Sequence, residues 1–238
     1  MALEPYIGNR LFTPLVIYNE GGLLTLYAIG DIHGCLNPLK SLIEKINPKK
    51  SDTLVFLGDY IDRGPKSKEV VDFLLSLDQK YRCIFLRGNH EAMLLHYLSG
   101  GPWGRYWELN GMEATLRSYG SIKNIPDRHM DFFKATKLYY ENSKYLFVHA
   151  GIRPGIEMAK QSEQDLLWIR DEFIYSKTLL KGKIVVFGHT PKFGGPLILK
   201  DKIGLDTGCV YGGNLTALRT KDLKFFTANC GVPAKKQY

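Results

Sequence analysis

The chain has 238 residues, of which 45% are hydrophobic and 24% charged, and its formal net charge is +8. These values are typical of a soluble globular protein that is long enough to bury a substantial core. The positive charge favours phosphorylated or otherwise acidic partners. No dense run of lysine and arginine occurs in the sequence, so the charge pattern argues against a nucleic-acid-binding surface.

The four cysteines, Cys35, Cys83, Cys209 and Cys230, are far apart and include no CxxC pair. In a chain of this size, such spacing predicts free thiols in a reducing compartment rather than a disulfide framework or a zinc knuckle. Residues 1–18 lack the basic segment and apolar core of a signal peptide, and no apolar run is long enough to span a membrane. The sequence therefore predicts a cytoplasmic protein without a membrane partner.

An apolar run at residues 23–29 predicts the first strand, and Asp31 and His33 follow it between two glycines. On an extended segment, side chains two residues apart point to the same side, so both can approach one ion. Residues 38–46 then have the apolar spacing of an amphipathic helix, and Asn37 is expected to cap it. The first polar cluster therefore lies between a strand and a helix.

Two more strands are predicted, at residues 53–57 and 82–86, and a polar cluster follows each of them. The clusters consist of Asp59, Asp62 and Arg63 after the earlier strand and of Asn89, His90 and Glu91 after the later one. An amphipathic helix at residues 67–77 connects the two strands. Because α/β proteins place their chemistry at the carboxyl ends of their strands, we expect these clusters to lie close together.

From residue 92 to residue 141 the pattern changes to helical stretches separated by turns. We interpret this segment as a helical insert in a single domain that spans residues 1–238, because no repeat or linker divides the chain. Trp103, Tyr106 and Trp107 cluster in the insert. Packing is the favoured explanation for these aromatic residues, and contact with a substrate is the alternative.

Strands resume at residues 145–148 and 184–187, and His149 and His189 follow their ends. A short helical pattern between these two strands leads to Arg170. The rest of the sequence predicts β structure in three segments, at residues 203–208, 215–218 and 223–227.

Six side chains near the ends of the predicted strands have the chemistry of metal ligands: Asp31, His33, Asp59, Asn89, His149 and His189. This set suits two divalent ions if one carboxylate, that of Asp59, lies between them. Burial of so many polar groups without a ligand would leave charges and donors unsatisfied, which disfavours a purely structural role. Mixed nitrogen and oxygen ligands without a thiolate favour manganese, iron, zinc or cobalt, with manganese as the first choice.

At these residues the sequence resembles the metallophosphoesterases of the PPP serine/threonine protein phosphatase type, and especially their compact bacterial and phage members. Residues 30–34, 58–64 and 88–91 carry the resemblance, together with His149 and His189. It extends over about residues 27–213. It implies an α/β fold, in which a β-sandwich of two mixed sheets is flanked by helices and the active site lies at the carboxyl ends of the strands.

The resemblance also implies a role for each site residue. It assigns one ion to Asp31, His33 and Asp59, and the other to Asp59, Asn89, His149 and His189. A water shared by the two ions then attacks phosphorus directly, without a covalent intermediate. His90 is the expected general acid, and Asp62 orients it. Arg63, Arg170 and Asn89 are the expected ligands of the substrate phosphate.

The sequence therefore predicts a metal-dependent serine/threonine protein phosphatase that also accepts phosphotyrosine, with a phosphorylated protein or peptide as its substrate. The alternative is a small-molecule phosphoesterase similar to the symmetrical diadenosine tetraphosphatases, in which the aromatic insert would stack on a base. Those enzymes typically replace the Asp of the Asp-Arg-Gly triplet and carry Asp after Asn-His. Asp62 and Glu91 are both present here, and this favours the protein phosphatase branch.

Overall fold

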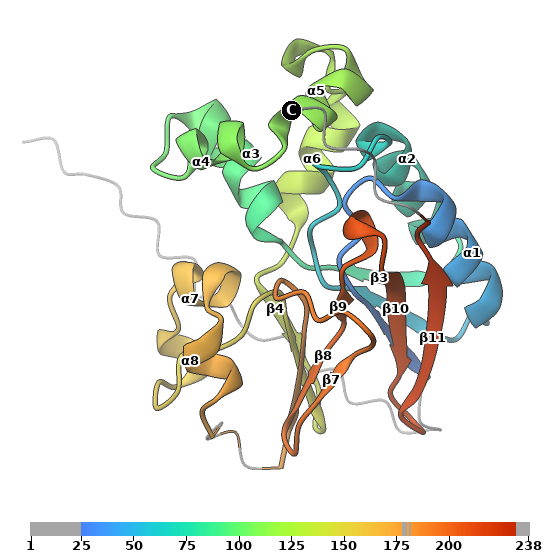
Figure 1. Ribbon diagram of the computed structural model, residues 1–238, viewed down its shortest axis with the longest axis vertical. Coiled ribbons are helices and arrows are strands. Elements are labelled where there is room, and N and C mark those ends of the chain that lie inside the picture. The colour runs from blue at the N-terminus through green and yellow to red at the C-terminus, as the bar shows by residue number, and fades with distance from the viewer. Residues whose placement is uncertain (1–24, 178–179, 181, 232–238) are drawn as a thin grey trace, which may run out of the picture.

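The computed structural model describes residues 25–177, 180 and 182–231, and two β-sheets form its centre (Figure 1). The first sheet contains β1 (Leu26–Ile29), β2 (Thr53–Phe56), β3 (Arg82–Phe85), β9 (Asp206–Thr207), β10 (Asn214–Arg219) and β11 (Lys224–Asn229). Its order is β11-β10-β1-β2-β3, with β9 paired to β10, and β1, β2 and β3 are parallel.

The second sheet contains β4 (Tyr139–Glu141), β5 (Tyr145–Val148), β6 (Ile184–Phe187), β7 (Leu197–Ile198) and β8 (Lys202–Gly204). Its order is β4-β5-β6-β8-β7, and β5, β6 and β8 are parallel. Both sheets also contain antiparallel pairs. The prediction of two mixed sheets is therefore confirmed.

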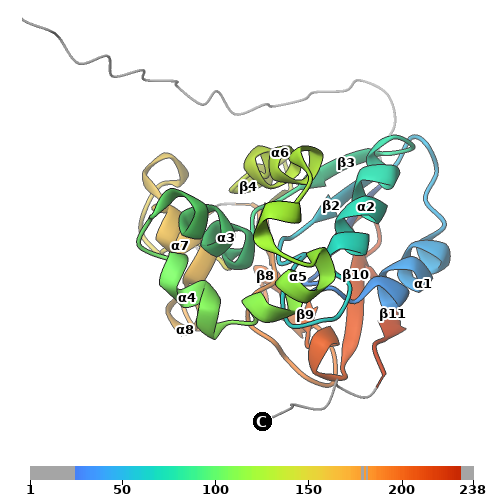
Figure 2. The same ribbon diagram turned by 90° about the horizontal axis from the view of Figure 1, so that it is seen from above.

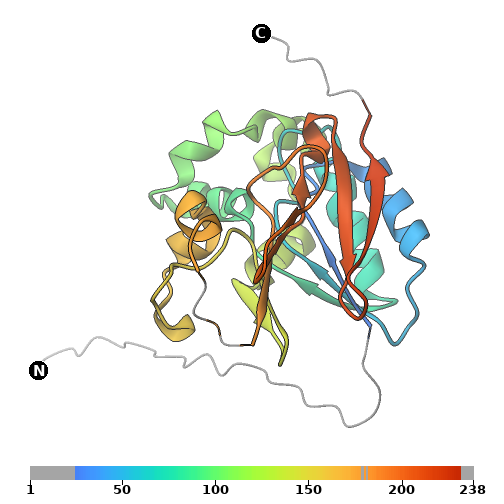
Figure 3. The ribbon, with the colours of Figure 1, turned by 60° about the horizontal axis from the view of Figure 1, so that its bottom comes forward.

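The described residues also form helices around the two sheets. The α-helices are α1 (Leu36–Ile46), α2 (Ser67–Asp78), α3 (Asn89–Ser99), α4 (Gly104–Leu109), α5 (Met112–Tyr119), α6 (Asp127–Ala135), α7 (Glu163–Trp168) and α8 (Asp171–Ile174). Three short 3₁₀ helices are η1 (Ile122–Asn124), η2 (Met158–Lys160) and η3 (Cys209–Tyr211). Figures 2 and 3 show α1 and α2 on one side of the sandwich and α7 and α8 on the other.

The central strands are buried on both faces. In β1, Leu26 and Ala28 pack in the core between the two sheets, with residues of β5 and β6. Tyr27 and Ile29 of the same strand pack in a second core with the apolar faces of α1 and α2. A third core lies between the second sheet and helices α7 and α8. This two-sided burial explains why the strands are continuous apolar runs in the sequence.

Helix α1 begins at Leu36, so Cys35 occupies the position before its first residue. The expectation that Asn37 caps the helix is therefore wrong. The cause is the tight connection from β1, in which the Cys35 N–H donates to the Ile32 carbonyl at 3.1 Å and the helix starts at once. The predicted apolar face is buried, and it consists of Leu39, Leu42, Ile43 and Ile46.

Helices α3 to α6 and strand β4 occupy the segment that was interpreted as a helical insert. A buried chain of hydrogen bonds ties this segment to α2. The Tyr119 hydroxyl of α5 contacts His129 Nδ1 of α6 at 2.8 Å, and His129 Nε2 contacts Asp72 Oδ1 of α2 at 3.1 Å. Two neighbouring helices of the insert are therefore fixed to α2, which is 57 positions away in the sequence at the contact between Asp72 and His129.

The predicted strand at residues 203–208 is two strands that belong to different sheets. Strand β8 pairs with β6, whereas β9 pairs with β10. The chain changes sheet at Leu205, whose carbonyl oxygen would clash with a Cβ atom on Gly30. Glycine at position 30 therefore allows the end of β1 to approach this crossing closely.

Cys209 and Cys230 form a disulfide, so the prediction of free thiols is wrong for these two residues. Antiparallel pairing of β10 with β9 and β11 brings their Cα atoms to 5.2 Å although 21 positions separate them in the sequence. Cys35 and Cys83 are free thiols, as predicted. The disulfide removes the support that four free thiols would have given to the prediction of a reducing compartment.

Part of the N-terminal analysis lies outside the described residues. This applies to the absence of a signal peptide in residues 1–18 and to positions 23 and 24 of the first predicted strand. Within residues 25–177, 180 and 182–231, none of the helices combines the length and the apolar character that a bilayer crossing requires.

Candidate metal centre

The six predicted metal ligands follow the ends of β1, β2, β3, β5 and β6, and each is at most 5% exposed. The structure brings their side chains together from both sheets. Side chains at the site form two groups, and within each group the ligand atoms all lie within 4.8 Å of one another. One group is His33, Asp59 and His90, and the other is Asp59, His149 and His189. The carboxylate of Asp59 belongs to both groups.

The two carboxylate oxygens of Asp59 face different partners. Oδ2 lies 3.3 Å from His33 Nε2 and 3.9 Å from His90 Nε2. Oδ1 lies 3.5 Å from His149 Nε2. Burial by itself would raise the pKa of Asp59, but the surrounding imidazoles of His149, His90 and His33 hold it well below its usual range. Asp59 is therefore an anion with one oxygen directed at each group.

The hydrogen bonds of His149 and His33 show which of their ring nitrogens carries a lone pair. His149 donates from Nδ1 to the carbonyl oxygen of Leu57 at 2.9 Å, and burial lowers its pKa, so its Nε2 directs a lone pair at Asp59. His33 likewise donates from Nδ1 to the carbonyl oxygen of Ile61 at 2.8 Å. The Nε2 atom of His33 accepts from Arg63 Nη1, whereas the lone pair of His149 Nε2 faces the Asp59 carboxylate and is repelled unless a cation lies between them.

Asn89 completes the second group. Its Oδ1 lies 2.9 Å from both His149 Nε2 and His189 Nδ1. Among the described residues, the buried Nε2 atoms of His189 and His90 have no hydrogen-bond partner. Imidazole nitrogens with amide and carboxylate oxygens suit borderline divalent metals. The His and Asp side chains are therefore positioned to form a dinuclear metal site.

Asp31 lies beside these groups and is held by the backbone. The His189 N–H donates to both of its oxygens, at 3.2 and 3.0 Å. Burial raises the pKa of Asp31 well above its usual value, and the nearby carboxylates of Asp206 and Asp59 raise it further. A bound cation would relieve this crowding of buried carboxyl groups. Asp206 is a buried neighbour that the sequence analysis did not identify as part of the site.

His90 and Asp62 meet in a closed network. His90 Nδ1 lies 2.6 Å from Asp62 Oδ2, which also accepts from Trp107 Nε1 at 2.8 Å. Thr115 Oγ1 donates to Asp62 Oδ1 at 2.6 Å. Burial raises the pKa of Asp62 to about 7 and lowers that of His90 well below its usual value. The network fixes the ring of His90 so that Nε2 points toward Asp59.

The sequence analysis did not connect Trp107 and Thr115 with the site. Trp107 is fully buried, as a packing role predicts, but its indole N–H also holds Asp62. The two residues are 45 and 53 positions from Asp62 in the sequence, so no local pattern links them.

Glu91 fixes the loop that carries Asp59. Its carboxylate accepts from the backbone N–H groups of Asp59 at 2.9 Å, Tyr60 at 2.8 Å and Gly88 at 2.9 Å. Asp59 itself has a left-handed backbone with φ of 54°, a conformation that costs energy in a residue with a side chain. A Cβ atom on Gly88 would meet Asp59 Oδ1, so this approach requires glycine. Glu91 is therefore a structural support of the site.

Two arginines lie next to the metal-ligand groups. Arg63 Nη1 donates to His33 Nε2 at 2.7 Å, and its guanidinium carbon lies 5.7 Å from the centroid of the Tyr211 ring. Arg170 is exposed, and its Nη1 donates to the carbonyl oxygen of His189 at 3.1 Å. The structure thus brings both predicted phosphate ligands to the site, one beside each group.

Comparison with known proteins identifies the family. The model of the calcineurin-like phosphoesterase family matches residues 24–224. The chain belongs to this family. The calcineurin-like phosphoesterase fold accounts for the two mixed sheets, the flanking helices and the metal groups at the strand ends, so the predicted fold class is confirmed.

The relatives within this family include nucleotide hydrolases. Bis(5′-nucleosyl)-tetraphosphatase PrpE [asymmetrical] of Oceanobacillus iheyensis is 30% identical, and the match covers 86% of this chain and 92% of the relative. The protein of the same name from Bacillus subtilis is 28% identical, with 86% and 94% covered. A solved structure of a candidate diadenosine tetraphosphatase has 25% identity, a TM-score of 0.69 and coverage of 88% and 95%.

A protein serine/threonine phosphatase from Saccharomyces cerevisiae is 17% identical with a TM-score of 0.61 and covers 90% of this chain and 82% of that one, a likeness of fold alone. The prediction of a protein serine/threonine phosphatase with a phosphorylated protein substrate is therefore wrong, because the relatives that match most of the chain at 25–30% identity are named as tetraphosphatases. That prediction relied on the presence of Asp62 and Glu91. Both are fully buried and hold His90 and the Asp59 loop, so they do not report on the substrate.

Proposed function

We propose that this protein is a dinuclear metal-dependent hydrolase of dinucleoside tetraphosphates. The observation that carries the proposal is the match over 86% of the chain to a relative named as an asymmetrical bis(5′-nucleosyl)-tetraphosphatase. The two ligand groups that share Asp59 support the same chemistry, because a pair of divalent cations is suited to phosphate hydrolysis. The proposed cleavage is asymmetrical, unlike that of the symmetrical enzymes considered from the sequence.

The proposal assigns the metal ligands as the family resemblance implies. Asp31, His33 and Asp59 hold one ion, and Asp59, Asn89, His149 and His189 hold the other. Manganese is the proposed metal, since no thiolate is among the ligands and imidazole is combined with oxygen. The chemistry that such a pair supplies is neutralisation of the phosphate oxygens and activation of water at neutral pH.

His90 is proposed to donate a proton from Nε2 to the departing phosphate oxygen while its Nδ1 takes up a proton from Asp62, whose pKa of about 7 lets the carboxyl group carry one near neutral pH. Asp62 positions this ring through the contact of 2.6 Å with Nδ1. The leaving group from a phosphoanhydride is itself a phosphate, whose second pKa is about 6, so it needs less protonation than an alkoxide does. We therefore expect His90 to matter less for a tetraphosphate than for an alkyl phosphate monoester.

Arg63 and Arg170 are proposed to bind the phosphate chain. Each guanidinium offers planar pairs of N–H donors, which match phosphate oxygens. Arg63 contacts His33 of one metal group and Arg170 contacts His189 of the other. A chain of several phosphates bound at the metals would reach both arginines, and Asn89 would stay close to the phosphate under attack.

The test is a parallel assay of the manganese-loaded protein on diadenosine tetraphosphate and on a phosphothreonine peptide at equal concentrations. We expect kcat/KM to be at least about tenfold higher for the dinucleotide. Chromatography of the products should show AMP and ATP in equal amounts, which is the result of asymmetrical cleavage. Faster release of phosphate from the peptide would refute the proposal. ADP as the single product of diadenosine tetraphosphate would refute the asymmetrical cleavage.

A further inference from the structure

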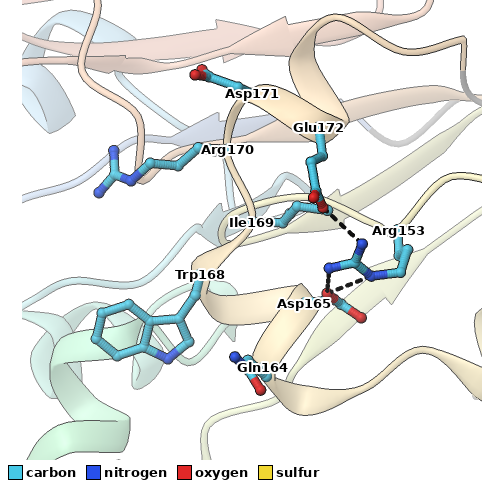
Figure 4. A pocket seen from close by; sticks show the side chains of 8 residues that line it. All are labelled: Arg153, Gln164, Asp165, Trp168, Ile169, Arg170, Asp171 and Glu172. Atoms are coloured by element: carbon cyan, nitrogen blue, oxygen red, sulfur yellow. Dashed lines mark hydrogen bonds and ion pairs between the residues drawn. The ribbon is translucent and has the colours of Figure 1, made fainter.

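Helices α7 and α8 line a hollow of about 320 Å³ beside the metal centre (Figure 4). The residues around it that matter here are Arg153, Gln164, Asp165, Trp168, Arg170 and Glu172. The volume is at the lower end of the range for small-molecule sites. It is therefore of a size for one nucleoside rather than for a segment of polypeptide.

The hollow adjoins the metal group that contains His189. The ring of Trp168 lies edge-on to the His189 ring, with 6.2 Å between their centroids. Arg170, which donates to the His189 carbonyl, also lines the hollow. A phosphate chain that leaves the metal centre past Arg170 would therefore bring the group at its end to Trp168.

The far wall of the hollow is fixed by ion pairs. Arg153 donates to Asp165 Oδ1 at 2.9 Å from Nε and at 2.6 Å from Nη2, and to Glu172 Oε2 at 2.7 Å from Nη1. These ion pairs join α7 to α8, as Figure 4 shows. Arg153 offsets one of the two carboxylates, so this wall keeps a net negative charge and suits the uncharged nucleoside better than the phosphate chain.

The near wall offers groups that suit a nucleobase. Trp168 is half-buried and is held edge-on by Trp103 at 6.0 Å between ring centroids. Its buried Nε1 has no hydrogen-bond partner among the described residues. Gln164 is exposed on the same helix, and its amide provides both a donor and an acceptor. An aromatic face beside an amide is a common way to hold a base.

We propose that this hollow is a nucleoside subsite, in which Trp168 stacks on the base at one end of a dinucleoside polyphosphate and Gln164 contacts the edge of that base. The inference rests on the proposed function and names the part of the substrate that the α7–α8 surface recognises. Arg170 would then bind the phosphate adjacent to the bound nucleoside.

The first experiment compares Trp168→Leu and Gln164→Ala with the parent protein on two substrates. One is diadenosine tetraphosphate, and the other is dimethyl tetraphosphate, which keeps the phosphate chain and lacks both nucleosides. We expect Trp168→Leu to raise KM for the dinucleotide about tenfold and Gln164→Ala to raise it about threefold. KM for dimethyl tetraphosphate should stay at the parent value in both variants.

Tyr175→Ala is the matched control, because it removes an aromatic ring that is 84% exposed and does not line the hollow. It should behave as the parent on both substrates. An equal loss on both substrates in Trp168→Leu, or an unchanged KM for the dinucleotide in both hollow variants, would overturn the inference. Because Gln164 is exposed, its variant tests the hollow even if replacement of Trp168 disturbs the fold.

A binding measurement separates this inference from the proposed function. Calorimetry with AMP and with ribose 5-phosphate detects the contribution of the base without turnover. The parent should bind AMP at least about tenfold more tightly than ribose 5-phosphate, and Trp168→Leu should abolish this difference. If the dinucleotide is not hydrolysed but AMP binding follows this pattern, the subsite stands and the proposed function fails. If the parent binds both ligands equally, the subsite is wrong even when the tetraphosphate is cleaved.

Discussion

The two arginines beside the metal centre are held in different ways. Arg63 is half-buried, lies on a left-handed backbone with φ of 65°, and contacts both His33 and the Tyr211 ring. Arg170 is exposed, and its side chain donates to the His189 carbonyl at 3.1 Å and to Thr190 Oγ1 at 3.5 Å. One guanidinium is thus fixed in place, whereas the other lies at an open surface.

The surroundings extend this contrast. On the Arg63 side, Tyr211 belongs to η3, and the disulfide of Cys209 ties that helix to the end of β11. On the Arg170 side, the chain leads into the hollow between α7 and α8. A preorganised group loses little entropy when it binds, and an open one can adapt to different groups. The side of Arg63 is therefore suited to the chemistry, and the side of Arg170 is suited to recognition of the rest of the substrate.

The largest expected effect comes from Asp59, which both sides share. Asp59→Asn should lower kcat by about 1,000-fold or more, because one carboxylate oxygen faces each metal group. Metal analysis by mass spectrometry should show fewer than two ions per chain. Asp52→Asn is the control, since Asp52 is also buried but accepts from the Lys49 N–H away from the site. Full activity with two bound ions would contradict the shared role of Asp59.

Reduction of the disulfide tests the constraint on the fixed side. The bond closes a loop of 21 positions, so its loss should lower the free energy of unfolding by about 3 kcal/mol. Urea denaturation with and without a dithiol reductant measures this change. Cys83→Ser should keep the sensitivity to the reductant, and Cys209→Ser should lose it. An unfolding midpoint that does not respond to the reductant would show that the disulfide adds no stability.

Asp62→Asn tests the closed network around His90. The amide would turn one N–H donor toward the groups that now donate to the carboxylate, so the His90 ring would lose its fixed position. We expect kcat to fall about 100-fold while two metal ions stay bound. Thr115→Ser keeps the hydroxyl that donates to Asp62 and should be close to the parent. Loss of metal in proportion to activity would mean that Asp62 acts through the metal site instead.

Arg63→Ala and Arg170→Ala compare the two arginines directly. We expect kcat/KM for diadenosine tetraphosphate to fall about 30-fold in Arg63→Ala and about fivefold in Arg170→Ala, because the fixed guanidinium makes its charged hydrogen bonds at a smaller entropic cost. Inhibition by inorganic phosphate should weaken in the same order. The corresponding lysine variants keep the charge and control for its loss. A larger effect at Arg170 would reverse the proposed division of roles.

The smallest effect is expected at Cys35, which lies on the fixed side next to His33. Burial raises the pKa of this thiol to about 12, so at pH 8 almost none of it is the reactive thiolate. Iodoacetamide at pH 8 should therefore leave Cys35 unmodified and the activity unchanged, as peptide mass spectrometry can measure. Denatured protein is the control and should be alkylated at this position. Rapid modification in the folded state would show that the metal motif is more open than the structure indicates.

The five strands that carry the metal ligands, the polar clusters at their ends and the types of metal ligand could be predicted from the sequence. Apolar runs, glycines and the spacing of Asp31 from His33 are local properties, so they can be recognised before the chain is folded. The family resemblance also predicted that Asp62 contacts His90. The Asn37 cap failed because the start of α1 depends on a tight turn from β1 and not on the side chain.

The surroundings of these residues depend on tertiary packing. Trp107 and Thr115 hold Asp62 from 45 and 53 positions away, the pairing of β10 joins Cys209 to Cys230, and α7 with α8 forms the hollow at Trp168. Each of these contacts depends on where two distant segments pack, which no local pattern encodes. The choice of substrate also depends on such contacts. The metal chemistry is common to many phosphate esters and anhydrides, and the surfaces around the metal centre select among them.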